Sequence, residues 1–380
     1  MKVRYYGHVQ QATGYGHAAR ELVRALVSAG AEVEVRTIGP RDLSWDPGDL
    51  SELLAPVGAP DAIIVHTLPG DCGRVLELEG LRRGAGPKLV AYTTWEALTA
   101  PLEVVAPLYE GFDQVWSPSR PCALSLATNG THANASDRKD AESRTHVIPH
   151  TYNPDRDLPV VTQRGDVYRF YWVGAWTARK NPGGLVRAFA YAFAPGDAVE
   201  LVLHSPRCAL ETYAATLAAT GLRQADLPAV RLSGRHLSQD ELEQLHASAD
   251  CFVSAARGEA WNLPAFDALL ARRHVIAQYG LGSDEYLTDT SADLVDGWES
   301  PAQVDVSLAQ SEGGEVTARV IGAQGLSARS LWLEPNLYSM AEAMRAAYRD
   351  GRRGLDVSYD PAQRYGYAAV ARQALNVLEA

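Results

Sequence analysis

The feature that most constrains the fold is a repeated alternation of short apolar runs with amphipathic helical stretches. Asp61–His66 (DAIIVH) and Lys88–Thr93 (KLVAYT) are continuous apolar runs, as expected of strands that a parallel sheet buries on both faces. His17–Ala29 carries apolar residues at helical spacing and stops at Gly30. Strands that alternate with helices predict β-α-β units and doubly wound parallel sheets.

The first half of the chain repeats this pattern up to a stretch that suits a linker. Further strands are expected at Lys2–Tyr6, Val33–Thr37, Gln114–Trp116 and His146–Ile148. The polar stretch Asn129–Arg144 has no period and is expected to be an exposed, mobile loop. Thr151–Asp166 is poor in apolar residues and holds two prolines, so we expect a first domain at 1–152 and a linker at 153–167.

The second half predicts another α/β domain, at 168–358. Strands are expected at Tyr168–Val173, Val199–His204, Val230–Leu232, Asp250–Ser254 and His274–Ala277, and helices at Gly184–Phe193, Leu263–Ala271, Leu337–Asp350 and Pro361–Ala380. Ser238 and Glu241 form a capping-box pattern, and Leu287–Leu331 is less regular. We expect two Rossmann-like domains facing each other across a cleft, with the closing segment 359–380 crossing back to the first domain.

Composition narrows the class of protein. A chain of 380 residues suits two domains, and 46% hydrophobic with 21% charged residues is ordinary for a soluble globular protein. No apolar run is long enough to span a bilayer and no signal peptide is evident, so we expect a cytoplasmic protein. The net charge of −11 disfavours nucleic acid as a partner, and four scattered cysteines predict free thiols rather than a metal site.

Three loops carry the candidate chemistry. Thr13-Gly-Tyr-Gly16 follows the first strand, where glycines let a ligand approach the backbone and a helix N-terminus favours negative charge. The loop lacks a full G-x-G-x-x-G, so a tight structural turn remains the alternative. In Gly174–Pro182, Arg179 and Lys180 suit a diphosphate, and the alternative is a solvated basic turn.

The third loop, Arg257–Asp267, places two carboxylates around the start of a helix. Glu259 precedes the helix and is free to bind sugar hydroxyls, and Asp267 lies one turn into it. Carboxylates at this spacing suit a polyhydroxylated ligand. The alternative for Asp267 is a charge that complements the helix dipole.

These loops also carry a resemblance to a known family. RGEAWNLPAFDALLAR resembles the E-x7-E segment of the family 4 (group 1) retaining glycosyltransferases, which have the GT-B fold. VGAWTARKNP resembles their Gly-Arg-x-x-x-x-Lys loop, and TGYGHAARELVRAL their N-terminal glycine loop. Further similar segments, in the family's order, are Tyr92–Glu96, Val115–Ser119, Val147–His150, Tyr279–Asp284 and Trp332–Pro335. The glycine loop with Thr-x-Trp-Glu also resembles bacteriophage members, some of which modify DNA bases.

The resemblance implies transfer of a sugar from a nucleotide-sugar, UDP- or GDP-linked, with retention at the anomeric carbon and without a metal or other cofactor. Lys180 and Arg179 would contact the diphosphate, Glu259 the sugar hydroxyls and Asp267 the ribose. The full set of implied donor-binding residues is Gly14, Tyr15, Gly16, Gly174, Arg179, Lys180, Arg257, Trp261, Asn262, Leu263 and Asp267.

Three residues are assigned to the acceptor side. Glu96 aligns with a family position that faces the cleft, so it is the candidate base or orienting group for the acceptor hydroxyl, and Glu259 is the second catalytic candidate. His66 and Trp95 are candidates for acceptor binding. A structural role for His66 and a core role for Trp95 and Trp261 remain open.

Two departures leave other functions open. Ala175 stands where the family usually has a phosphate-binding Arg, and Ala260 replaces a common Gly. The alternatives are a GT-B sugar phosphorylase or epimerase, and a non-catalytic nucleotide-sugar binding protein. The acceptor is open between a glycan or lipid head group, a metabolite, a protein and a hydroxymethylated DNA base.

Overall fold

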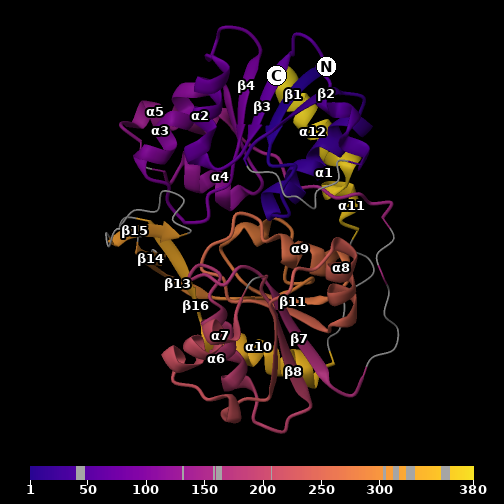
Figure 1. Ribbon diagram of the computed structural model, residues 1–380, viewed down its shortest axis with the longest axis vertical. Helices are drawn as coiled ribbons and strands as arrows, with labels where there is room; N and C mark the ends of the chain where they lie inside the picture. Colours follow the sequence, from indigo (N-terminus) through magenta and orange to yellow (C-terminus); the bar gives the residue numbers. More distant parts are fainter. Residues whose placement is uncertain are drawn as a thin grey trace. The chain divides into compact units, whose positions relative to one another are not determined.

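A computed structural model of the chain describes residues 1–39, 48–130, 132–156, 159, 165–206, 208–302, 305–310, 316–321, 330–351 and 360–380. These residues form two compact units (Figure 1). The first unit contains Met1–Arg156 and Asp360–Ala380, and the second contains the described parts of Asp157–Ala323 and Leu331–Tyr359. The linker expected at 153–167 lies partly outside the described residues.

The first unit is built on a six-stranded parallel sheet in the order β2-β1-β3-β4-β5-β6. Its strands are β1 Lys2–Gly7, β2 Glu32–Thr37, β3 Ala62–His66, β4 Lys88–Tyr92, β5 Gln114–Ser117 and β6 Thr145–Val147. Its helices are α1 Gly14–Ser28, α2 Pro69–Glu79, α3 Leu102–Gly111, α4 Arg120–Ala127 and α5 Ala135–Arg144, with 3-10 turns η1 Gly48–Leu50 and η2 Glu52–Leu54. The strand order reverses between β1 and β3.

The C-terminal helices complete the first unit. The expected helix Pro361–Ala380 is two helices, α11 Ala362–Tyr365 and α12 Tyr367–Glu379, because Gly366 between them has an extended backbone. The α12 helix lies beside α1 (Figure 1), and the Tyr367 hydroxyl donates to Glu21 of α1 at 2.6 Å. Lys88 of β4 donates to the carbonyl of Leu378 at 2.9 Å.

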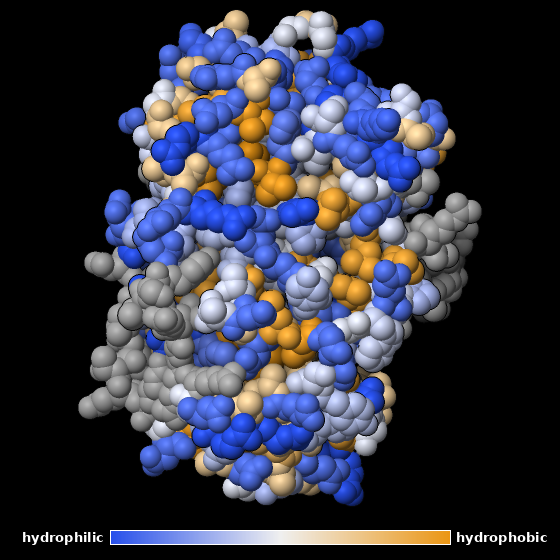
Figure 2. Space-filling model, turned by 180° about the vertical axis from the view of Figure 1, so that it is seen from behind, coloured by the Kyte–Doolittle hydropathy of each residue, from blue (hydrophilic) through white to orange (hydrophobic). Residues whose placement is uncertain are grey.

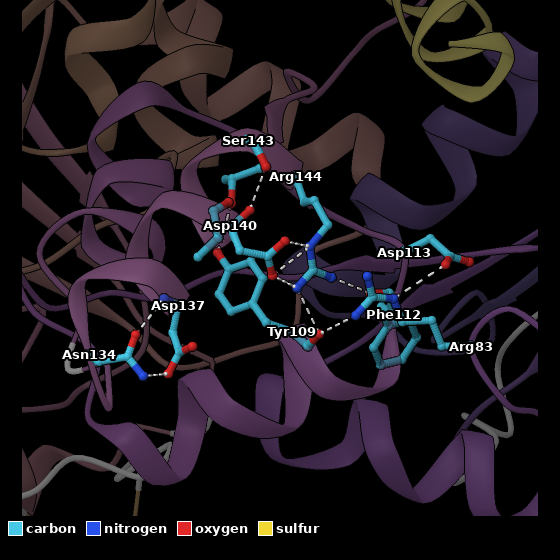
Figure 3. Close-up of polar contacts among 11 residues, drawn as sticks. Arg83, Tyr109, Phe112, Asp113, Asn134, Asp137, Asp140, Ser143 and Arg144 are labelled. Atoms are coloured by element: carbon cyan, nitrogen blue, oxygen red, sulfur yellow. Dashed lines mark hydrogen bonds and ion pairs between the residues drawn. The ribbon is translucent and has the colours of Figure 1, made fainter.

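The expectation of a mobile loop over Asn129–Arg144 is wrong, because Ala135–Arg144 forms helix α5. The Asn134 side chain caps the helix by accepting from the backbone N–H groups of Ser136 and Asp137. Arg144 pairs with Asp140 one turn earlier and donates to the carbonyl oxygens of Tyr109 and Phe112 (Figure 3). Capping and this docked arginine stabilise a helix that has almost no apolar face.

The second unit also has a six-stranded parallel sheet, in the order β12-β11-β10-β7-β8-β9. The strands are β7 Tyr168–Val173, β8 Val199–His204, β9 Ala229–Ser233, β10 Cys251–Ser254, β11 His274–Gln278 and β12 Asp293–Val295. The helices are α6 Pro182–Ala192, α7 Leu210–Thr220, α8 Gln239–Ser248, α9 Leu263–Leu270 and α10 Leu337–Arg349, with 3-10 turns η3 Gln224–Asp226 and η4 Gly282–Glu285. The predicted capping box of α8 is confirmed. The order reverses between β7 and β10.

The stretch 287–331, expected to be irregular, contains strands of two antiparallel ribbons in addition to β12. Strand β13, Gly297–Pro301, pairs with β16, Leu331–Pro335, and β14, Asp305–Gln310, pairs with β15, Val316–Ile321. The ribbons follow one another at one side of the second unit (Figure 1). These strands were not predicted, because they are short and the stretch that contains most of them is rich in Gly, Ser and Thr.

The apolar strands lie inside each unit. Tyr5, Ile64 and Val90 of the first sheet, and Phe170 and Val253 of the second, have no measurable exposure. The face drawn in Figure 2 shows hydrophilic residues interrupted by small apolar patches. Across the described residues, the structure contains no helix with the length and apolar character needed to cross a bilayer.

Candidate functional site

Each sheet has one switch point, the place where the strand order reverses. Ligands of doubly wound sheets bind beyond the carboxyl ends of the strands at such points. In the first unit, the loop after β1 and the start of the β3–α2 connection meet there. In the second unit, the loops after β7 and β10 meet there. The candidate residues from the sequence lie in or next to these four segments.

The second switch point carries a charged triad in which Arg179 and Lys180 flank the buried Glu259. The Lys180 ammonium donates to one oxygen of Glu259 at 2.5 Å, and Arg179 donates to the other at 3.3 Å. The side chain of Glu259 is 4% exposed, against 14% for Lys180 and 19% for Arg179. Two cations share one carboxylate, so the triad keeps one positive formal charge in a chain whose net charge is −11. That residual charge suits an anion.

Local backbone geometry fixes the β7–α6 loop that carries Lys180. Asn181 adopts a left-handed conformation with φ of 51° and caps α6 by accepting from the N–H of Gly184 at 3.0 Å. Gly174 opens the loop, and a side chain there would meet the ring of Trp172 at 2.7 Å. The loop conformation therefore depends on these residue types.

The β10–α9 loop, which carries Glu259, is held by hydrogen bonds from Tyr286 and Gly282 to its backbone carbonyls. Asn262 is also left-handed, with φ of 68°, but its side chain does not cap α9. Its carbonyl accepts from the buried Tyr286 hydroxyl at 2.8 Å, and the same hydroxyl lies 2.9 Å from the carbonyl of Trp261. Gly282 donates to the Glu259 carbonyl at 2.8 Å, and a Cβ on Gly282 would lie 2.1 Å from Ala260.

Arg257 joins the two loops to the β13–β16 ribbon. Its guanidinium donates to both carboxylate oxygens of Glu334, at 2.5 and 3.0 Å, and to the carbonyl of Ala178 at 2.6 Å. Every nitrogen of the guanidinium therefore has a protein acceptor. The sequence predicted Arg257 as a donor ligand, and the structure places its charge against Glu334.

Asp267 lies on α9 and faces α8. Its carboxylate is 25% exposed and lies 4.0 Å from Nε2 of His246. Burial lowers the pKa of His246 to about 3, so this histidine is neutral at pH 7. The other ring nitrogen of His246 lies 2.8 Å from the Tyr171 hydroxyl.

The first switch point carries a buried cluster of histidine and tyrosine rings. His66 ends β3 between Gly7 of β1 and Tyr92 of β4. Its ring stacks on Tyr92 with centroids 4.2 Å apart, and its Nδ1 lies 2.5 Å from the Tyr5 hydroxyl. The Tyr92 hydroxyl donates to the carbonyl of Ile148 at 2.7 Å. Within the described residues, His66 Nε2 is buried and has no hydrogen-bond partner.

Burial keeps this cluster neutral. It lowers the pKa of His66 well below its usual value and lowers the pKa of His150 to about 3. It raises the pKa values of Tyr5 and Tyr92 well above theirs. At pH 7 the cluster therefore offers hydrogen bonds without charge.

The glycine segment is part of a helix rather than a loop before one. Helix α1 begins at Gly14, because the Thr13 side chain caps it by accepting from the N–H of Gly16 at 3.2 Å. A Cβ on Gly16 would lie 2.0 Å from the carbonyl oxygen of Gln11, so only glycine fits there. The Tyr15 hydroxyl hydrogen-bonds to Thr94, which lies on the loop after β4.

The remaining predicted residues are Glu96 and Trp95 in the first unit and Trp261 and Leu263 in the second. Glu96 is partly exposed, and its negative charge adds to the effect of burial in raising the pKa of Tyr15. Trp95 and Trp261 are each 2% exposed, which favours the core role for both. Leu263 begins α9 beside Asn262. Among the described residues, no cluster of three or more His, Cys, Asp or Glu side chains is arranged to hold a metal ion.

Sequence analysis missed Tyr5, Tyr286 and Glu334. Tyr5 lies in the strand β1, where an aromatic side chain is expected to pack in the hydrophobic core. Tyr286 lies in a stretch without a period. The segment Trp332–Pro335 was noted, but nothing in its pattern connects Glu334 with a residue 77 positions earlier.

No protein-family model matches the sequence, and no curated protein matches it significantly. Solved structures do match. Sucrose-phosphate synthase from Thermosynechococcus elongatus has a TM-score of 0.66 at 15% identity and covers 100% of this chain and 98% of its own. HepE of Anabaena, solved with UDP and glucose, has a TM-score of 0.63 at 13% identity, with 100% and 99% covered. The lipopolysaccharide outer core galactosyltransferase WaaB has a TM-score of 0.61 at 11% identity, with 100% and 99% covered.

These likenesses extend over the whole chain and establish its fold. The two units, each with a parallel six-stranded sheet, make up a two-domain α/β protein of the GT-B fold. The fold class expected from the sequence is therefore confirmed. At 11–15% identity, these similarities establish the fold of this chain but not its activity.

Proposed function

We propose that the protein is a retaining glycosyltransferase of the family 4 type, which transfers a sugar from a nucleoside diphosphate sugar to a hydroxyl acceptor. The observation that carries the proposal is the Arg179–Lys180–Glu259 triad at the second switch point of a GT-B fold. Structures with the same fold include HepE in complex with UDP-glucose. The proposed donor is a UDP- or GDP-sugar, and no metal takes part in the proposed reaction.

Lys180 and Arg179 would bind the diphosphate. The leaving nucleotide gains negative charge as the glycosidic bond breaks, so fixed cations stabilise the transition state more than the ground state. Before the donor binds, Glu259 would offset the repulsion between these two adjacent cations. An arriving diphosphate supplies further negative charge to the cations and allows Glu259 to accept hydrogen bonds from sugar hydroxyls.

The start of α9 would bind the rest of the donor. Asn262 leaves the N-terminus of α9 without a side-chain cap, which favours the approach of an oxygen ligand to the amide of Leu263. Asp267 would accept hydrogen bonds from the ribose diol. His246 beside Asp267 is neutral at pH 7 and adds no positive charge there.

The first unit would supply the acceptor side of the reaction. Gly14, Tyr15 and Gly16 form the first turn of α1, where the helix dipole favours donor phosphates. His66 would bind an acceptor oxygen through Nε2, and Glu96 would orient the acceptor hydroxyl or receive its proton. We assign residues 1–152 to the acceptor domain and 168–358 to the donor domain.

The proposal is tested with purified protein and UDP-, GDP-, ADP-, CMP- and dTDP-sugars. We expect one nucleotide class to raise the melting temperature by several degrees and to be released slowly by hydrolysis. NMR of the first glycoside product should show the anomeric configuration of the donor. Glu259→Gln should abolish turnover, whereas the control Glu243→Gln, at a partly exposed position of α8, should not.

The other outcomes separate the alternatives. Formation of a sugar phosphate, or conversion of the donor without an acceptor, would instead identify a phosphorylase or an epimerase. Tight donor binding without turnover over a broad acceptor panel would identify a binding protein. Product with inverted configuration would overturn the retaining assignment alone.

A further inference from the structure

We infer that Arg257 is a positioning residue for the donor site: with Glu334 of the β13–β16 ribbon, it holds the Lys180 and Glu259 loops together and does not contact the donor. This inference rests on the proposed function. It differs from the expectation that the Arg257 charge meets the donor directly, and it gives the ribbon a role in the site.

The side chain of Arg257 is fully engaged by protein. Two of its nitrogens form a bidentate pair with Glu334, and the third donates to the Ala178 carbonyl, two residues before Lys180. The Arg257 side chain is 16% exposed and that of Glu334 is 24% exposed. A planar guanidinium can bridge a carboxylate and a carbonyl in fixed directions, whereas an ammonium acts as a point charge.

The backbone of Arg257 makes the same connections. Its N–H donates to the carbonyl of Arg179 at 2.8 Å, and its carbonyl accepts from the N–H of Leu333 at 2.9 Å. Arg257 therefore has two bonds to the Lys180 loop and three to the ribbon. The carboxylate of Glu259, two residues after Arg257, accepts from the Lys180 ammonium. We call Arg257 and Glu334 the clamp. Arg257 lies two residues before Glu259, and its acceptor Ala178 lies two residues before Lys180.

The ribbon is anchored where it leaves and rejoins the unit. Gly297 begins β13 opposite Pro335 of β16, and the N–H of Asn336 donates to the Asp296 carbonyl at 2.9 Å. Glu334 lies next to this closed base, so its backbone is fixed. Because Glu334 is held in place, its bonds to Arg257 restrict the movement of both the Lys180 loop and the Glu259 loop.

The test compares three variants with the wild-type protein. Glu334→Gln weakens the bidentate pair, and Arg257→Lys keeps the charge but cannot bridge both acceptors. Glu200→Gln is the matched control, because Glu200 is 2% exposed and pairs with Arg169 and Arg231 near the amino ends of β7 and β8. UDP and GDP dissociation constants are measured by calorimetry below the melting transition, with amide hydrogen exchange over 174–181 and 257–262.

We expect Glu334→Gln and Arg257→Lys each to weaken nucleotide binding at least tenfold and to speed exchange in both loops. Glu200→Gln should lower the melting temperature yet leave nucleotide binding within twofold. If one clamp variant fails to fold, the other decides. Wild-type protein that binds neither nucleotide would overturn the proposed function together with this inference. Wild-type binding with both clamp variants within twofold of it would overturn the inference alone.

Discussion

The two switch points have the same architecture and opposite chemistry. Beyond β7 and β10, the second sheet ends in charged side chains that neutralise one another only in part. Beyond β1 and β3, the first sheet ends in histidine and tyrosine rings that burial keeps neutral. A Rossmann-like sheet supplies the place for a ligand, and the few residues after the strands decide which ligand fits.

Under the proposed function, this difference would suit the two reactants of a sugar transfer. A leaving diphosphate needs fixed positive charge, whereas a hydroxyl acceptor is held by hydrogen bonds. The predictions below alter one side at a time.

The largest effect is expected from Lys180→Ala at the charged end. Loss of this cation should lower the rate of donor turnover roughly 10²–10³-fold, because one fixed stabilising group is missing when charge develops. The measurement is the steady-state rate of nucleotide release. Arg187→Ala, on an exposed position of the adjacent α6, is the control and should retain the wild-type rate. Normal turnover by Lys180→Ala would show that the Lys180 ammonium does not stabilise the leaving group.

The neutral end should respond to pH through His150, whose folded pKa of about 3 lies below its ordinary 6.5. Between these values the unfolded chain binds a proton that the folded chain does not. The free energy of unfolding is therefore unaffected by His150 above pH 6.5. It falls as pH drops from 6.5 toward 3, by up to about 1.4 kcal/mol per pH unit.

The check is urea unfolding of the wild-type protein and His150→Gln between pH 7 and pH 4. The variant should show a shallower loss of stability, by about one proton, while the exposed His236→Gln should follow the wild type. Equal slopes for all three proteins would show that His150 is not held neutral by the fold.

The smallest effect is expected outside both ends, at the cap of α5. Asn134→Ala removes the acceptor for two backbone N–H groups and should cost about 1 kcal/mol of stability in the first unit. Donor turnover should not change, which separates stability from function. Ser136→Ala, next to the cap, is the control for calorimetric unfolding. A change in turnover for Asn134→Ala would mean that the two are coupled.

The sequence predicted the parallel sheets because apolar runs and helical periods are local signals. Every strand expected in the first half is present to within a residue or two, from β1 to β6. Helix α5 was missed because its stability comes from a cap and from Arg144 bonds to carbonyls some 30 residues earlier. Such contacts leave no periodic pattern.

The charged part of the candidate site was also visible in the sequence, because Lys180 and Glu259 lie in loops that follow strands. Their 2.5 Å contact was not, since 79 residues separate them. The role of Tyr5 and the pairing of Arg257 with Glu334 depend on burial and on bonds across the fold. The family resemblance assigned Arg257 to the ligand.

Calorimetric titration with UDP and GDP measures whether the charged triad binds a nucleoside diphosphate. We expect saturable binding of one nucleotide by the wild-type protein, at least tenfold weaker binding by Lys180→Ala, and unchanged binding by Arg187→Ala. Absence of binding to the wild-type protein, or equal affinity of the wild type and Lys180→Ala, would contradict this expectation.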